Sequence, residues 1–303
     1  MMGIFTSFAK SLRANRRQLA SLILLAFAAA AAAQQAPAGQ KVIKDPAEYN
    51  AYTAAVNTQD ANKRAEELEA FVQQYPQSVV LTDALEQELA AWQTVGDSSQ
   101  MKRTAKRLLV ADPGNVRVLG IVVVLERVSA AQGDLASLNE MCVEATGGMR
   151  EVSTWRKPAG MSDTDFAALS KLMNDIFIGA EGFCAVQEKN YSQAKDWLTR
   201  ALQIDPTNVQ DIYQLAIADL EATPLDSNGF WYCARAIHLA QSAAIPQDAS
   251  GMITYCKAKY TQYHGADDGW DALVAAAAAE DGLPPDFARQ IKPAPAAAAA
   301  PQK

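Results

Sequence analysis

The sequence has few of the residues and motifs on which most enzyme chemistry depends. It contains only two histidines, His238 and His264, and no GxSxG, HExxH or GxxxxGK[ST] pattern. Acidic residues such as Glu66 and Glu67 are plentiful, but helical surfaces always supply them. We therefore expect no catalysis, no cofactor and no bound metal ion. A hydrolase built on an unrecognised carboxylate site is the alternative.

Cysteines are also few, and they form no metal or redox motif. The chain has Cys142, Cys184, Cys233 and Cys256, and no CxxC pair. An even number permits two disulfides in an exported chain. However, Cys233 and Cys256 lie on predicted antiparallel helices at heights that differ by several residues. We therefore expect buried free thiols.

Basic residues are outnumbered. The chain has 27 Lys and Arg against 34 Asp and Glu, a net charge of −7. Four of these cations lie in the first 33 residues, which contain no acid, so the remainder carries 23 cations against 34 acids, or −11. Because an acidic surface repels phosphate backbones, the balance argues against a nucleic-acid partner.

No apolar run is long enough for a standard transmembrane helix. The longest, residues 19–33, spans 15 residues, against about 20 needed to cross a bilayer. It follows a basic stretch ending at Arg17 and ends in the alanines Ala31 to Ala33, which offer a cleavage site before Gln34. This pattern predicts a signal peptide over 1–33 and a periplasmic or cell-envelope protein, with an uncleaved anchor as the alternative.

Alternating strand patterns are absent as well. Residues 121–125 are β-branched and aliphatic, but they lie within an apolar stretch of helical period, 116–128. The length of that stretch favours a buried helix. The whole chain therefore predicts an all-α fold.

Turn residues recur at a fixed interval along the first half. Gly96 and Gly133 are 37 residues apart, as are Pro76 and Pro113. Such a period indicates repeated helix pairs. A third pair should end near Thr146, with the following two glycines as C-cap signals and a loop over 149–161.

The segment 174–208 has the residue types that a helix–turn–helix unit of about 34 residues requires. Small residues occur where two helices must approach, an aromatic residue lies at the turn, and a proline ends the second helix. The residues are Gly182, Ala185, Tyr191, Ala194, Leu198, Ala201 and Pro206.

Residues 174–220 thus resemble the tetratricopeptide repeat family, with weaker matches over 48–146. The segment 205–208, Asp-Pro-Thr-Asn, matches the usual end of a repeat. The whole chain looks like an exported bacterial protein of this kind. The resemblance implies a right-handed α-solenoid that binds a peptide or protein in a concave groove lined by first helices.

Helical spacing places one set of residues along such a groove. The alternative is that the C-terminal helices cover this face. The predicted groove residues are Ile176, Phe183, Val186, Gln210, Tyr213 and Ile217. The resulting function is a scaffold or adaptor for an unknown protein or peptide, and a self-associating envelope protein is a further alternative.

Two other segments are candidate sites. Residues 230–235 are rich in aromatics, which suits an interface hot spot but more often marks core packing. Residues 264–271 contain one histidine and three aspartates, yet helix capping by Asp267 or Asp268 explains them better than a metal ion does. The predicted organisation is a signal peptide (1–33), a lead-in (34–44), a helical repeat domain (45–283) and an Ala/Pro-rich disordered tail (284–303).

Overall fold

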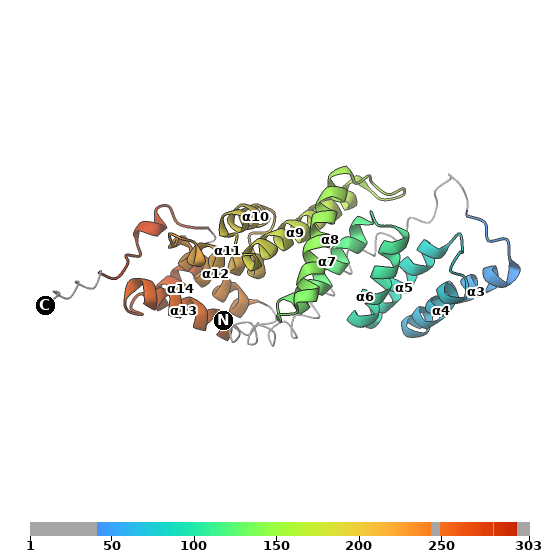
Figure 1. Ribbon diagram of the computed structural model, residues 1–303, viewed down its shortest axis with the longest axis horizontal. Helices are drawn as coiled ribbons and strands as arrows, with labels where there is room; N and C mark the ends of the chain where they lie inside the picture. Colours follow the sequence, from blue (N-terminus) through green and yellow to red (C-terminus); the bar gives the residue numbers. More distant parts are fainter. Residues whose placement is uncertain (1–40, 244–248, 281, 296–303) are drawn as a thin grey trace. The chain divides into compact units, whose positions relative to one another are not determined.

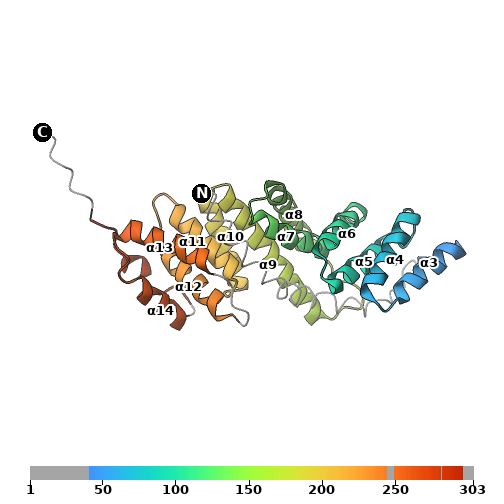
Figure 2. The same ribbon diagram turned by 90° about the horizontal axis from the view of Figure 1, so that it is seen from below.

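The computed structural model describes residues 41–243, 249–280 and 282–295, and in these ranges it is entirely helical (Figures 1 and 2). Twelve α-helices and one short 3₁₀ helix occur, with no strand in the described ranges. The predicted signal peptide and residues 34–40 lie outside the described residues. None of the described helices combines the length and the apolar content that a membrane crossing needs.

The chain divides into two compact units, with the boundary inside helix α9 (Asp163–Gln187). The N-terminal unit extends to Phe177 and the C-terminal unit begins at Ile178, apart from the turn Ala131–Gly133, which groups with the latter.

In the N-terminal unit, each helix from α3 to α8 packs against the next along the chain. This confirms the all-α fold of consecutive helix pairs. The helices are α3 (Pro46–Asn57), α4 (Ala61–Gln74), α5 (Leu81–Val95), α6 (Ser98–Ala111), α7 (Val116–Ala130) and α8 (Leu135–Thr154).

The predicted 37-residue period appears as a repeated helix cap. Asp60, Asp97 and Asp134 are the N-caps of α4, α6 and α8, and each carboxylate accepts a hydrogen bond from a backbone N–H of the first turn. Such a cap satisfies N–H groups that the helix itself leaves free. Gly96 and Gly133 directly precede two of these caps, with φ of 81° and 92°, a left-handed conformation that favours glycine.

Ion pairs join the capped helices at equivalent positions. Glu69 of α4 lies 2.6 Å from Arg103 of α6, and Lys106 of α6 lies 2.7 Å from Glu140 of α8. Each pair joins the ninth residue after one cap to the sixth residue after the next. The same stagger of about one helical turn therefore recurs along the unit.

The expected end of the third pair near Thr146 is wrong. Helix α8 continues through Gly147 and Gly148 to Thr154, so the loop predicted over 149–161 begins only at Trp155. The structure gives Gly148 another role: a Cβ atom there would lie 2.3 Å from the ring of Phe177. The glycine is present for close packing, and not as a helix stop.

The C-terminal unit continues the pattern of neighbouring helices. Helix α10 packs on α11, α11 on α12, and α12 on both α13 and α14. The helices are α10 (Tyr191–Ile204), α11 (Val209–Glu221), α12 (Asn228–Ser242), α13 (Ser250–His264), α14 (Trp270–Ala279) and the 3₁₀ helix η2 (Phe287–Arg289).

The expectation of buried free thiols is wrong, because all four cysteines are disulfide-bonded. Cys233 of α12 and Cys256 of α13 form a disulfide, with Cα atoms 5.9 Å apart, and Cys142 and Cys184 are disulfide-bonded too. The offset of α12 against α13 brings the two residues face to face, within the range that a bridge requires. Distance along the chain from the turn does not reveal that offset.

Candidate functional site

Helices α9 and α10 approach closely at Gly182 in the C-terminal unit. A Cβ atom there would lie 2.5 Å from Cγ of Leu198. Leu198, Ala194 and Ala201 are fully buried, and Ala185 packs in the same apolar cluster. Tyr191 is half-buried against this cluster, and Pro206 follows the end of α10 by two residues.

The six residues of the predicted partner groove are covered to different degrees. Phe183, Val186 and Tyr213 are buried, with 2%, 7% and 5% of their surface exposed. Ile176, Gln210 and Ile217 are half-buried. Ile176 belongs to the N-terminal unit and the other five residues to the C-terminal unit. Within the latter, Gln210 and Ile217 are thus the groove residues that a partner can reach most readily.

Helix α13 covers the Tyr213 side of this face. The Tyr255 ring meets the Tyr213 ring edge-on at 6.2 Å. The Tyr255 hydroxyl donates a hydrogen bond to Glu221 at 2.8 Å, and Lys259 pairs with the same carboxylate at 2.8 Å. Burial, followed by the bond to Glu221, raises the pKa of Tyr255, so the phenol stays protonated and remains a donor. These contacts fasten α13 to the end of α11.

A second polar cluster ties α10 to the loop after α11. The Lys195 ammonium lies 2.7 Å from Asp219 and 2.6 Å from Asp226. Burial raises the pKa of Asp219 to about 6, although the bond from Lys195 acts in the opposite direction. No motif predicted this cluster, since Asp219 and Asp226 lie 24 and 31 residues after Lys195; only the burial of Asp219 distinguishes it.

A cavity of about 530 Å³ lies beside this cluster, at the N-terminus of α10. Lys189, Asn190, Tyr191 and Thr223 contribute to its lining together with Lys195. The Lys195 ammonium already bonds to two carboxylates, so its charge is balanced within the chain. Lys195 therefore offers this cavity no unbalanced charge for a ligand.

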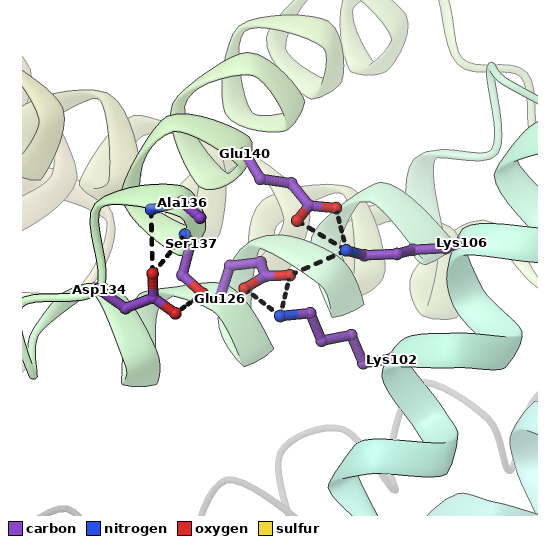
Figure 3. A network of polar contacts seen from close by, with 7 residues as sticks. All are labelled: Lys102, Lys106, Glu126, Asp134, Ala136, Ser137 and Glu140. Carbon is purple, nitrogen blue, oxygen red and sulfur yellow. Dashed lines mark hydrogen bonds and ion pairs between the residues drawn. The ribbon is translucent and has the colours of Figure 1, made fainter.

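The most extensive ionic network lies in the N-terminal unit and centres on Glu126 of α7 (Figure 3). This residue is fully buried, and its carboxylate lies 2.6 Å from Lys102 and 3.6 Å from Lys106. Burial alone would raise the pKa of Glu126, but hydrogen bonds from Lys102 and Ser137 outweigh it and the pKa is lowered. The network consequently holds α6, α7 and α8 together through a charged carboxylate.

In the segment 264–271, the prediction that Asp267 or Asp268 caps the next helix is wrong. Helix α14 begins at Trp270 with Gly269 as N-cap (φ 84°), and no side chain caps it. The Asp267 carboxylate pairs instead with Lys257 of α13 at 2.9 Å, which removes it from the helix end. No three His, Cys, Asp or Glu side chains in the described ranges meet as a metal site would require.

The expected tail is packed where the structure describes it. As far as residue 295, the chain after Leu283 forms η2 and then lies along α12 and α13, with Phe287 and Ile291 buried. The Phe287 ring meets that of Trp231 at 5.4 Å. Residues 296–303 lie outside the described residues. Two large apolar residues four apart in an otherwise Ala/Pro-rich stretch are the signal that could have predicted this packing.

Comparison with protein-family models and with curated proteins gives no match for this chain. The resemblance to tetratricopeptide repeats therefore depends on the residues of this chain alone.

Proposed function

We propose that this chain is an exported scaffold of the tetratricopeptide-repeat type, which holds another protein on its stacked helix pairs and performs no chemistry. The observation that carries the proposal is the close contact between α9 and α10. Gly182 lies directly beneath Leu198, and the small residues Ala194 and Ala201 are fully buried. Small residues at such contacts are what lets helix pairs stack into binding solenoids.

The N-terminal unit supports the repeat interpretation independently. Its aspartate caps recur every 37 residues, and its ion pairs use the same two positions in successive helices. A unit that reuses both local and cross-helix contacts is typical of a repeat array.

Two ionisable groups with raised pKa values, Asp219 and Tyr255, support a structural role. Asp219 is bonded to Lys195, and Tyr255 is bonded to Glu221. Perturbed pKa values also arise in structural ion-pair networks, and here each group is engaged with a neighbour on another helix or loop.

The cysteines support export. No cysteine is free, and disulfides persist mainly in oxidising compartments such as the bacterial periplasm. Fractionation of the producing cells should place the chain in the envelope fraction, with thiols that react with maleimide only after reduction. A cytoplasmic chain with free thiols would contradict this part of the proposal.

Site-specific photo-crosslinking tests the scaffold role. Gln210 on α11 is half-buried on the proposed binding face, whereas Gln203 on α10 is an exposed glutamine that serves as a matched control. A photoreactive amino acid at each position is activated in the producing cells. One reproducible protein should be crosslinked from position 210 and not from position 203.

The crosslinked protein is then purified and its affinity for the chain is measured. Gln210→Arg should weaken binding at least about tenfold, since it places a charge in the contact, while Gln203→Arg should leave it unchanged. Crosslinks only between copies of the chain would favour self-association. Equal labelling from both positions would refute binding at this face.

A further inference from the structure

A segment of the chain itself, residues 284–295, lies on α12 and α13 in the manner of a bound peptide. Three hydrogen bonds hold its backbone. The Ser227 hydroxyl donates to the Ala288 carbonyl at 3.1 Å, His264 Nδ1 donates to the Lys292 carbonyl at 2.9 Å, and the Ala294 N–H donates to the Tyr263 carbonyl at 2.7 Å. Because these bonds go to the main chain, they do not depend on the segment's side chains.

Only two side chains of the segment are buried. Phe287 contacts Trp231 of α12, and Ile291 follows four residues later in the sequence. Asp286 and Arg289 pair with each other at the surface, with side chains 71% and 82% exposed. The segment, which includes the short helix η2, thus has backbone bonds to the helices beneath it and two apolar anchors, a combination by which proteins recognise short peptides.

The helices beneath the segment are held together without it. Cys233 and Cys256 join α12 to α13, and Phe230 packs on Tyr260 at 5.4 Å. Arg235 of α12 donates to the carbonyl oxygens of Ala277 and Glu280 and so fixes the end of α14. Release of the segment would therefore uncover a formed surface around Trp231.

We propose that residues 284–295 are an intramolecular ligand. They occupy a peptide-binding surface on α12 and α13 that accepts instead a short peptide from another protein, with an aromatic residue followed four residues later by a branched aliphatic one. We call this surface, formed by Ser227, Trp231, Tyr263 and His264, the segment-binding surface. The inference rests on the proposed scaffold function, for which it names a binding surface and a partner chemistry.

The segment competes with any such peptide at a high effective concentration, because about four residues separate it from α14. Short linkers give effective concentrations in the millimolar range. The intact chain should therefore bind an added peptide weakly, and a chain whose segment has lost its anchors should bind it well.

The probe is a fluorescein-labelled synthetic peptide of residues 283–295, titrated into three full-length proteins and followed by fluorescence anisotropy. The test protein carries Phe287→Ala and Ile291→Ala, the control carries Arg289→Ala, and the third is the unmodified chain. The double variant should bind the peptide at least about tenfold more tightly than the other two. A peptide with both anchors changed to alanine should bind none of them, and Ser227→Ala in the double variant should weaken binding severalfold.

The same affinity for all three proteins, with circular dichroism showing an intact helical fold, would overturn the proposal. If the double variant unfolds, the proposal is tested instead by hydrogen exchange at the Ala294 amide of the unmodified chain. Exchange should accelerate when the peptide is added in large excess, and unchanged exchange overturns the proposal. If these peptide experiments fail but the partner is still crosslinked from position 210, the segment-binding surface is refuted and the proposed scaffold function is not.

Discussion

Two adjacent glycines in α8 should respond to the same substitution with opposite signs. At Gly147, no atom lies within 4 Å of a Cβ atom added to the backbone. At Gly148, the added Cβ would lie 2.3 Å from the ring of Phe177, which is fully buried. Both residues have the same helical backbone, so their difference isolates packing from helix propensity.

The magnitudes follow from these surroundings. Gly147→Ala should stabilise the protein by about 0.5–1 kcal/mol, since alanine loses less backbone entropy in a helix than glycine does. Gly148→Ala gains the same amount but forces Phe177 or α8 to move. Overpacking of this kind costs about 1–3 kcal/mol. Because the clash is with the ring itself, we expect a net destabilisation of about 1–2 kcal/mol.

Urea denaturation of the two single variants, followed by circular dichroism with the disulfides intact, measures both effects. Phe177→Leu in the Gly148→Ala background provides the internal control. This double variant should lose less stability than the sum of its single variants, because the leucine side chain vacates the space that the new methyl group needs. Stabilisation by both alanine substitutions would refute the close packing of Gly148 on Phe177.

Other predictions concern buried charge and crosslinking. The raised pKa of Asp219 means that the folded chain binds more protons than the unfolded chain between about pH 4 and about pH 6, so this carboxyl's contribution to stability falls as pH rises through that window. In urea titrations, the free energy of unfolding of Asp219→Asn relative to that of the unmodified chain should therefore rise by about 2 kcal/mol between pH 4.5 and pH 7.5. A difference that does not change with pH would contradict the raised pKa of Asp219. Cys233→Ser should cost about 3 kcal/mol, from the 23-residue separation that the disulfide closes, in the same assay under non-reducing conditions. Lys102→Met should cost about 2–4 kcal/mol because it removes the 2.6 Å ion pair of the buried Glu126, which keeps only Ser137 and the Lys106 ammonium at 3.6 Å. The neighbouring Arg103→Met should cost about 1 kcal/mol or less because its ion pair is exposed, and equal losses would refute the distinction.

Local features of the fold could be predicted from the sequence. The α3 start at Asp45 and Pro46 and the turns at Gly96 and Gly133 agree with the structure, because caps and left-handed turns depend on residues close in sequence. The β-branched run 121–125 lies in α7, as its 3.6-residue period predicts.

Features that depend on distant residues could not be predicted in the same way. Gly147 and Gly148 look like a helix stop in sequence, and only the position of Phe177 shows that the second glycine is a packing site. Similarly, Asp267 has the sequence of a cap, yet Lys257 on the preceding helix takes its carboxylate. A local pattern does not reveal which tertiary partner competes for a side chain.

The candidate site also has features that the sequence could predict and features that it could not. Helical spacing could place Gln210, Tyr213 and Ile217 on α11, but it could not show that Tyr255 covers Tyr213. Composition indicated a disordered tail beyond Pro284, whereas two apolar residues suffice to seat residues 284–295 on α12 and α13. Average composition hides such anchors because it counts residues without regard to their spacing.

Helix α6 shows why a charge cluster in sequence is weak evidence for a docking site. Its four basic residues lie within six positions of an otherwise acidic chain, a pattern that would suit a patch for an acidic partner. Each instead pairs with a glutamate from a different neighbouring helix. The pairs are Lys102 with Glu126 of α7, Arg103 with Glu69 of α4, Lys106 with Glu140 of α8, and Arg107 with Glu88 of α5. Two of these glutamates, Glu88 and Glu126, are fully buried, so the cations on α6 balance charges that the unit's interior cannot leave unpaired. A partner that binds the N-terminal unit through acidic groups would have to compete with these internal pairs, so the basic residues of α6 give no support to an acidic partner there.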